Sequence, residues 1–139
     1  LGEFEQYIVA APAYLEQAAP IAKPEDLARH RWVALSLLQT PLTWKFTSAR
    51  GRARTVRMNA RLRTDSVAAL RGLVLAGGGV TALDEFSAAD ALRTGALVRV
   101  LPQWQLRRGG VHAVFPPGRF VSAKARAFAD FYKDWLASR

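Results

Sequence analysis

The sequence predicts an α/β domain with a mostly parallel or mixed sheet. Short apolar segments that are typical of strands alternate along the chain with segments whose apolar residues recur at helical spacing. Neither a repeat nor a linker-like stretch divides the 139 residues, which leave room for one domain or for two small lobes that share elements. The composition, 50% hydrophobic and 22% charged, excludes a disordered tail, a collagen-like chain and a coiled coil.

The first quarter of the chain alternates strands with helices that begin at proline. Residues 6–11 predict a short apolar strand, and Pro12, which suits the first position of a helix, begins a short helix through Gln17. Pro24 repeats this arrangement. The two acidic residues that follow Pro24 favour a helix start there, because the helix dipole is positive at that end. A strand is expected next, at residues 32–35.

Basic residues gather in the middle of the chain. The segment from Lys45 to Arg71 carries a net charge of +7, out of +9 for the whole chain. A strand at residues 43–47 overlaps its start, with Trp44 and Phe46 on one face. A second strand is predicted by the alternation of apolar Val56, Met58, Ala60 and Leu62 with polar or basic Thr55, Arg57, Asn59, Arg61 and Arg63. Its basic face is either a solvated surface or a surface for nucleic acid or an acidic ligand, although it offers no aromatic residue for base stacking.

Two further helices and three strands follow. A helix starts at Thr64-Asp65-Ser66, where each residue is a candidate N-cap, and Gly77-Gly78-Gly79 ends it. At least one of Gly77 and Gly79 should have a positive φ, because the chain reverses there from a helix into a strand at residues 80–83. The next helix, residues 85–92, closes at Gly95, and strands are expected at residues 97–101 and 111–115.

The last helix begins at Ser122 and has the clearest apolar stripe, formed by Ala125, Phe128, Ala129, Tyr132, Trp135 and Leu136. Few elements are left in the chain to bury this stripe. We therefore expect another chain, or a segment outside this sequence, to cover it, and dimers or larger species in solution. If Phe128 is buried in this way, Phe128→Ala should cost about 3–5 kcal/mol.

No arrangement of side chains typical of catalysis is recognisable. His30 and His112 are the only histidines, no Gly-x-Ser-x-Gly elbow occurs, and the acidic residues lack metal-ligand spacing. We expect no enzyme activity, no catalytic or metal-binding residues and no cofactor. The absence of cysteine excludes disulfides and fits a reducing compartment, and no segment is long and apolar enough to span a membrane.

Seven short motifs arrive in an order that resembles a known family. They are Ala11-Pro12-Ala13-Tyr14-Leu15, Pro24-x-Asp26-Leu27-x-x-His30, Trp44-x-Phe46, Ala76-Gly77-x-Gly79-Val80, Ala91-Leu92-x-x-Gly95-x-Leu97-Val98-x-Val100-Leu101, Val111-His112-Ala113-Val114-Phe115-Pro116 and Arg126-Ala127-Phe128-x-Asp130-Phe131. Over about residues 7–136 the chain resembles the C-terminal effector-binding half of LysR-type transcriptional regulators. One departure is Asp84, where many relatives have proline.

The resemblance implies a fold and a division of the chain. Such regulators begin with a winged helix-turn-helix and a linker helix, and their effector region has two lobes like a type II periplasmic binding protein. Residues 1–10 would then be a crossover strand from the first lobe, and residues 11–104 the second lobe. Residues 105–139 would be the strand and helix that return to the first lobe. The chain begins without Met, so we expect the opening strands of the first lobe to lie upstream.

The implied function is effector sensing. A small, anionic molecule would bind between the lobes and control DNA binding through the helix-turn-helix that this sequence lacks. The protein would be a cytoplasmic homo-oligomer, a dimer or tetramer, with no membrane partner. Two alternatives remain at this point. One is a solute-binding protein of a transport system with the same architecture, and the other is a basic nucleic-acid-binding module that uses the face with Arg57, Arg61 and Arg63.

Two segments are the candidate ligand site. The resemblance places effector contacts where the crossover strand enters the second lobe, at Ala10, Ala11 and Pro12, and at a helix start, at Thr64, Asp65 and Ser66. A helix start presents unpaired N–H groups and partial positive charge, which suit a carboxylate or a similar anion. For Ser66 the alternative is plain N-capping without a ligand.

Overall fold

A mixed five-stranded sheet organises residues Glu5–Arg107, the larger of two compact units in this computed structural model. The smaller unit combines Leu1–Phe4 with Arg108–Arg139, and the structure describes residues 1–118 and 121–138 of the chain. The alternation of strands and helices in the larger unit confirms the α/β class and the mixed sheet. The lobe boundaries expected after residues 10 and 104 stay a prediction.

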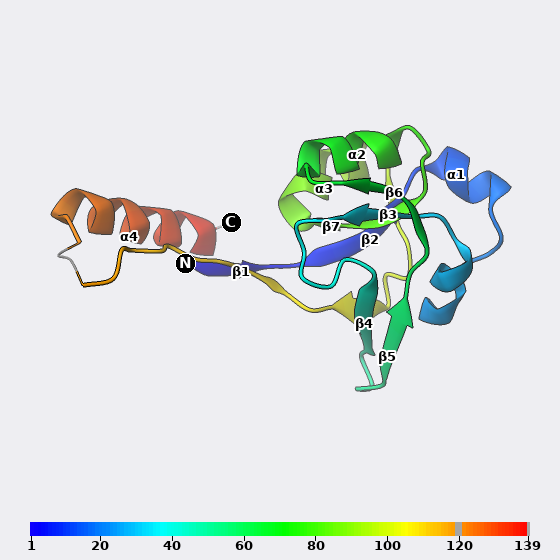
Figure 1. The fold of residues 1–139 in the computed structure, drawn as a ribbon, viewed down its shortest axis with the longest axis horizontal. Coiled ribbons are helices and arrows are strands. Elements are labelled where there is room, and N and C mark those ends of the chain that lie inside the picture. Colours follow the sequence, from blue (N-terminus) through cyan, green and yellow to red (C-terminus); the bar gives the residue numbers. More distant parts are fainter. Residues whose placement is uncertain (119–120, 139) are drawn as a thin grey trace. The chain divides into compact units, whose positions relative to one another are not determined.

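The order of the central sheet brings together strands that are far apart in the sequence. Along the sheet lie β6 (Ala60–Thr64), β3 (Trp32–Leu35), β7 (Val80–Asp84), β2 (Gln6–Ala10) and β8 (Val98–Arg99). Strand β3 runs parallel to β6 and β7, whereas β2 is antiparallel to β7 and β8. Helices α2 (Val67–Leu75) and α3 (Glu85–Thr94) cover one face (Figure 1). Apolar residues from both sides, Val9, Val33, Leu70, Val74 and Leu83 among them, form the core there.

The two covering helices begin and end where the sequence predicts. Ser66 caps α2, because its hydroxyl oxygen accepts a hydrogen bond from the Ala69 N–H at 3.2 Å. Asp84, the departure from the family pattern, caps α3 by accepting the Ser87 N–H at 2.8 Å. Helix α3 ends at Gly95, whose left-handed φ of 79° confirms the predicted C-terminal glycine.

The glycine turn between α2 and β7 also confirms its prediction. Gly77 has a φ of 84° and Gly79 a φ of 147°, both in the region that favours glycine. Around Gly77 nothing lies within 4 Å of the position that a Cβ would take. At Gly79 a Cβ would lie 2.2 Å from the Arg31 carbonyl oxygen, so the backbone of β7 can approach that of Arg31 only because residue 79 has no side chain.

A second, three-stranded sheet lies on the other side of the central sheet. It contains β5 (Ala53–Arg57), β4 (Thr43–Ser48) and β9 (Trp104–Leu106), in that order. Phe46 in the middle strand is fully buried and belongs to the same core as Trp32 of β3. The short α1 (Pro12–Gln17) and η1 (Pro24–Arg29) both begin at proline as predicted, although η1 is a 3-10 helix.

The continuous basic strand predicted from residue 55 to residue 63 is wrong. The chain leaves β5 after Arg57 and enters β6 at Ala60, so the two halves belong to different sheets. Between them, Met58 N–H donates to the Leu42 carbonyl and Asn59 accepts from the Trp32 N–H. The alternation of apolar and basic residues continues across this break, so periodicity could not reveal it. In the second half the apolar face is not buried, since Leu62 is 41% exposed.

Two other predicted strands are shorter than expected, or displaced. Of residues 97–101 only Val98–Arg99 form β8, since Leu101 has a φ of 54°. The strand expected at residues 111–115 is β10 (Gly109–Val111), which pairs with β1 (Gly2–Phe4) in the smaller unit. Its only partner in the described chain is three residues long, so the pairing stops at Val111. Strand β9 was not predicted, and β1 lies within residues 1–10, which the resemblance implied to be a crossover strand.

Helix α4 (Ala123–Ala137) begins after Ser122 as predicted, but its apolar stripe is not buried in this chain. Only Ala129 is buried, and Phe128 is 68% exposed. The rings of Phe128 and Tyr132 stack at 6.2 Å, and those of Tyr132 and Trp135 at 5.5 Å. The exposure of Phe128 in this chain agrees with the expectation that few elements here can bury the stripe, although β1 packs against α4. A cover by another chain stays a prediction.

Candidate functional site

The carboxyl ends of three parallel strands meet at one edge of the central sheet. Leu35 at the end of β3 lies beside Thr64 at the end of β6, and β7 ends at Asp84. Because β2 runs the opposite way, its first residue, Gln6, pairs with Asp84 and lies at the same edge. In open α/β sheets, this edge is where ligands usually bind.

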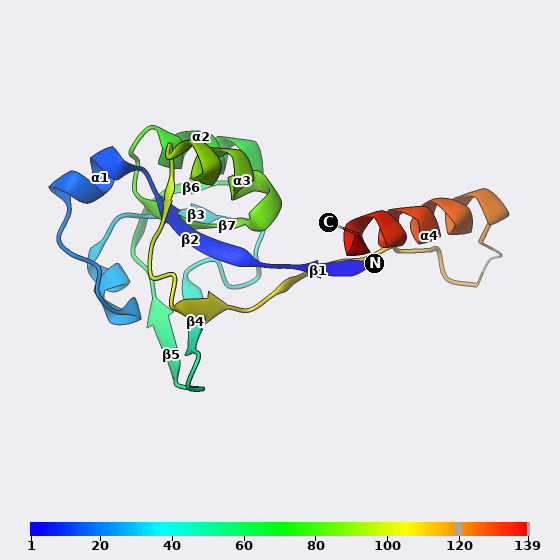
Figure 2. The ribbon, with the colours of Figure 1, turned by 180° about the vertical axis from the view of Figure 1, so that it is seen from behind.

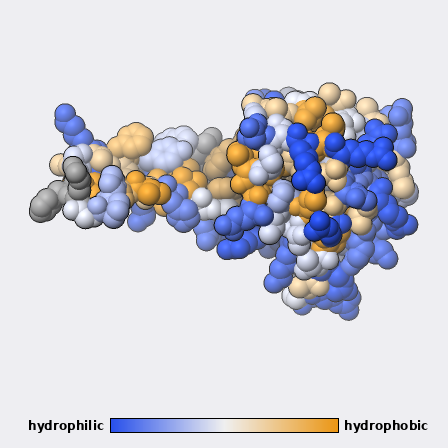
Figure 3. Space-filling view, in the orientation of Figure 1, coloured by the Kyte–Doolittle hydropathy of each residue, from blue (hydrophilic) through white to orange (hydrophobic). Residues whose placement is uncertain are grey.

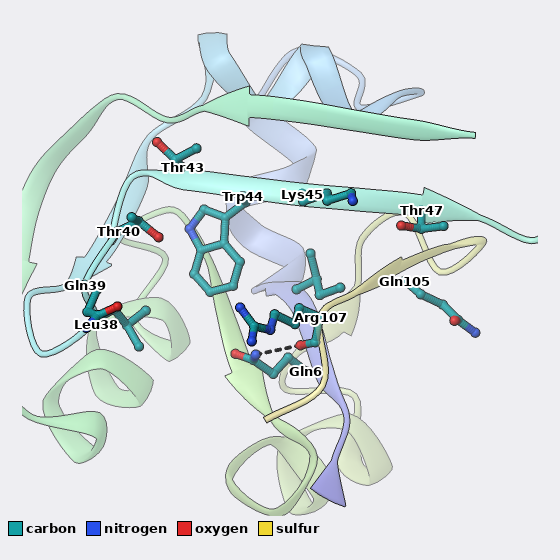
Figure 4. Close-up of a pocket in the computed structure, with 11 residues that line it drawn as sticks. Gln6, Leu38, Gln39, Thr40, Thr43, Trp44, Lys45, Thr47, Gln105 and Arg107 are labelled. Atoms are coloured by element: carbon teal, nitrogen blue, oxygen red, sulfur yellow. Dashed lines mark hydrogen bonds between the residues drawn. The ribbon is translucent and has the colours of Figure 1, made fainter. Parts of the chain in front are cut away.

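A cavity of about 830 Å³ opens at this edge, between the central sheet and the three-stranded sheet. Four separate segments contribute to its lining: the start of β2, the loop after β3, strand β4, and β9 with the residue after it. The lining residues are Gln6, Leu38, Gln39, Thr40, Thr43, Trp44, Lys45, Thr47, Gln105, Leu106 and Arg107 (Figure 4). Its volume is within the range of small-molecule sites.

The chemistry of the lining is cationic and rich in hydrogen-bonding groups. Lys45 and Arg107 supply positive charge, and no carboxylate is among the lining residues. The Gln6 amide donates to the Arg107 carbonyl oxygen at 2.9 Å, which ties the start of β2 to the end of β9. Trp44 donates its indole N–H to the Pro41 carbonyl oxygen at 3.2 Å. The N–H is therefore already hydrogen-bonded, and the ring offers the cavity an apolar surface. Figure 4 shows Trp44, Gln6 and Arg107 gathered in the middle of this group.

The structure places one of the two predicted site segments at this edge. Thr64 lies at the end of β6, and its carbonyl oxygen accepts two hydrogen bonds from Ser36, the residue that begins the loop leading to Leu38 and the cavity. Thr64 Oγ1 accepts from the Ser66 N–H at 3.2 Å, and Asp65 between them is exposed. Both hydroxyl oxygens at this helix start are therefore engaged in local capping, while each keeps a proton that it can donate.

The other predicted segment lies at the opposite end of the sheet. Ala10 pairs with Val80, the first residue of β7, and α1 leaves this end of β2 (Figure 2). Ala10 and Ala11 are buried in the two cores, whereas Pro12 is exposed. The structure therefore does not bring Ala10, Ala11 and Pro12 together with the helix start at Ser66, and a ligand role for any of the six residues stays a prediction.

Sequence patterns did not single out the residues that line the cavity. Gln6, Trp44 and Lys45 were noted only as members of predicted strands or of a basic segment, and Arg107 was not noted. These residues lie close together because of the order of strands in two sheets, and the spacing of apolar residues along the chain cannot reveal that order. A basic residue directly after the last apolar residue of β9 is the only feature that could have drawn attention to Arg107.

The buried histidine has a structural role in the described chain. His30 is 7% exposed, and its Nδ1 lies 2.9 Å from the Tyr14 hydroxyl, which in turn accepts the Arg31 N–H. Burial lowers the pKa of His30 below its ordinary value, so the folded chain holds the neutral ring. Among the described residues, no group of three or more His, Asp or Glu side chains could hold a metal ion.

This pKa shift predicts how stability depends on pH. As the pH falls below about 6.5, the unfolded chain protonates His30 before the folded chain does, so the free energy of unfolding should decrease until the lowered pKa is reached. Above that range His30 contributes no pH dependence. Urea unfolding between about pH 8 and 5 should show less of this decrease in His30→Gln, whereas His112→Gln, which changes an exposed histidine, should retain it. An equal decrease in all three proteins would contradict this role.

Comparisons with known proteins agree on one family. The LysR substrate binding domain family matches residues 1–137. The chain is 40% identical over 136 residues to the HTH-type transcriptional regulator PtxR of Pseudomonas aeruginosa, covering 98% of this chain and 43% of that regulator. It is 25% identical over 132 residues to the HTH-type transcriptional regulator CrgA of Neisseria meningitidis, covering 94% and 44%. The chain thus spans less than half the length of these relatives, which are regulators and not enzymes.

Solved structures show the same fold. The regulatory domain of the C227S variant of AphB from Vibrio vulnificus superimposes with a TM-score of 0.79 at 22% identity, covering 94% of this chain and 64% of that one. The CrgA regulatory domain gives a TM-score of 0.71 at 24% identity, with the same coverage. The fold is thus the type II periplasmic-binding-protein-like α/β fold, and no helix in the described residues is long and apolar enough to cross a membrane. With a family match over 137 residues, the chain belongs to the LysR substrate-binding domain family.

Proposed function

We propose that this chain is the effector-sensing part of a LysR-type transcriptional regulator, and that the cavity lined by Trp44, Lys45 and Arg107 binds the effector. The observation that carries this proposal is the position of that cavity at the carboxyl edge of the sheet in a substrate-binding domain. The helix start at Thr64, Asp65 and Ser66 lies at the same edge and supplies further donors.

The chemistry of the cavity favours a small anion with a flat apolar part. Lys45 and Arg107 would attract a carboxylate, and the absence of lining carboxylates removes a source of repulsion. Threonine hydroxyls and glutamine amides would donate or accept around it. The indole of Trp44 would pack against an aromatic or unsaturated portion of the ligand.

Ligand binding there would act on the backbone at both passages between the two units. Gln6 and Arg107 line the cavity. Gln6 follows Glu5, the first residue of the larger unit, and Arg107 is its last residue. A ligand held by these residues would favour one conformation of the connecting strands over another. In the whole regulator this preference would reach DNA through the helix-turn-helix domain, in a cytoplasmic homo-oligomer, a dimer or tetramer.

The alternatives are less well supported. The relatives named above are transcriptional regulators, which favours this function over that of a transport solute-binding protein. The basic residues that suggested a nucleic-acid-binding module are divided between two sheets, with Arg57 on β5 and Arg61 and Arg63 on β6. They therefore do not form the single strand face on which that alternative was based.

Two probes of nearly the same shape but different charge test the effector cavity. Benzoate should bind and raise the melting temperature of the chain, whereas benzamide, uncharged and of nearly the same shape, should bind more weakly. Arg107→Gln and Lys45→Gln should each weaken benzoate binding about tenfold, the value of a charge-assisted hydrogen bond, as measured by titration calorimetry. Arg93→Gln on exposed α3 is the control and should leave binding unchanged.

The same assay tests the predicted residues at the helix start. Loss of the benzoate-induced shift in Thr64→Val and Ser66→Ala, with folding intact, would support their contact with the ligand. Ser66→Ala should also cost about 1 kcal/mol by removing the cap of α2, so its melting temperature is compared with and without probe. Equal binding of benzoate and benzamide in every variant would contradict an anion-selective cavity.

A further inference from the structure

A second charged cavity lies at the opposite end of the central sheet, where β3 and β6 begin. Its volume is about 460 Å³. The residues around it come from the end of η1, the loop before β3 and the start of β6, and they are Ala28, Arg29, His30, Arg31, Asn59, Ala60 and Arg61. In Figure 3, hydrophilic side chains are prominent on the part of the larger unit where Figure 1 places α1.

The positive charge of this cavity is not balanced by its surroundings. Three arginines line it and no carboxylate does. Of these, Arg29 pairs with Asp26 at 3.1 Å, whereas Arg31 and Arg61 form no ion pair in the part of the chain that the structure describes. The other acidic residue of η1, Glu25, already pairs with Arg54 at 3.1 Å. Two exposed guanidinium groups thus share one concave surface without a counter-charge.

The backbone that carries these cations is held firmly. Arg31 donates its N–H to the Tyr14 hydroxyl at 3.2 Å, and its carbonyl oxygen accepts the Val80 N–H at 2.8 Å. The close approach of Gly79 fixes the same peptide from a further side. Next to it, the Asn59 carbonyl accepts the Trp32 N–H at 3.1 Å, which positions the start of β6. A site on such a fixed backbone loses little backbone conformational entropy when a ligand binds, so the entropy cost falls on the arginine side chains.

We propose that this cavity is a separate binding site for a small phosphate-bearing anion, held by the guanidinium groups of Arg31 and Arg61 and the amide of Asn59. The planar fork of arginine matches the oxygens of a phosphate group, and two arginines that line one cavity favour a multiply charged anion over a single carboxylate. The cavity is concave and of small-molecule size. No Phe, Tyr or Trp lines it and the ring of His30 is buried, so bases of a nucleic acid would find no exposed stacking partner.

The test uses pyrophosphate as the probe and the 139-residue chain in a phosphate-free buffer. Titration calorimetry at about 0.15 M salt suppresses diffuse attraction between exposed charges. Pyrophosphate should bind, and Arg31→Gln and Arg61→Gln should each weaken binding about tenfold. Arg50→Gln is the matched control: it removes the same charge from the β4–β5 turn, outside the cavity, and should change binding by less than about twofold.

Further arms identify the source of the phosphate group and separate this site from the effector cavity. Inorganic phosphate that binds as tightly as pyrophosphate would assign the site to the free ion, and weaker binding would assign it to a larger phosphorylated compound. Benzoate binding should be unchanged in Arg31→Gln. Absence of pyrophosphate binding, or equal weakening by Arg50→Gln, would overturn the proposal. Tight binding of a random DNA duplex that is weakened equally by Arg31→Gln, Arg61→Gln and Arg50→Gln would overturn the proposal in favour of a diffuse polyanion surface.

Discussion

Replacing Gly79 with alanine is expected to destabilise the chain by about 3 kcal/mol or more, a large part of the stability of a typical domain. Two effects act together. The φ of 147° is one that alanine rarely adopts, and the new Cβ would lie 2.2 Å from the carbonyl oxygen of Arg31. That oxygen is backbone and accepts the Val80 N–H, so it cannot move without breaking the start of β7. Urea unfolding monitored by circular dichroism measures the loss.

Two other glycines in the same region are matched controls. Gly77→Ala should cost about 1 kcal/mol, because its φ of 84° is unfavourable but the space around it is open. Gly72→Ala should stabilise the chain by about 0.5–1 kcal/mol, since Gly72 lies inside α2 with nothing near its added methyl group. Equal losses for Gly79→Ala and Gly77→Ala would show that the close approach of Arg31 is not the reason for glycine at residue 79.

Phe46→Ala should cost about 3–5 kcal/mol, the usual loss when a buried aromatic ring leaves a cavity. Phe46 has no exposed surface, and it lies in the middle strand of the three-stranded sheet, facing the core shared with Trp32. Truncating it would remove apolar contacts on which the packing of the two sheets depends. The measurement is the free energy of unfolding in urea, and an unchanged near-ultraviolet spectrum would show that the folded state is retained.

Phe128→Ala changes the same residue type in an exposed position. Because Phe128 is 68% exposed, the substitution should cost less than about 1 kcal/mol in the 139-residue chain. The loss of about 3–5 kcal/mol expected from the stripe on the last helix would return only if another chain covers it. A cost for Phe128→Ala that rises with protein concentration, together with dimers in light scattering, would support such a cover. Equal losses for both variants at every concentration would contradict the exposure of Phe128.

The position of most elements could be predicted from the sequence because their signals are local. Pro12 and Pro24 begin helical segments, Ser66 and Ser122 cap helices, and Gly95 ends one, each through the chemistry of its own backbone. The reversal at Gly77 and Gly79 follows from the same kind of reasoning, since few residues can join a helix to a strand over so short a distance.

What only the tertiary structure decided is which segments meet. Arg57 and Arg61 follow one alternating pattern, yet they lie in different sheets, because hydrogen-bonding partners far away in the sequence determine where a strand ends. The candidate site shows the same dependence: Thr64 lies at the edge of the sheet where the cavity opens, whereas Ala10 is at the other end because β2 runs antiparallel to β7. The sequence determined the family, most of the elements and the caps of several helices. The order and direction of the strands, which are non-local, determined which side chains form a site.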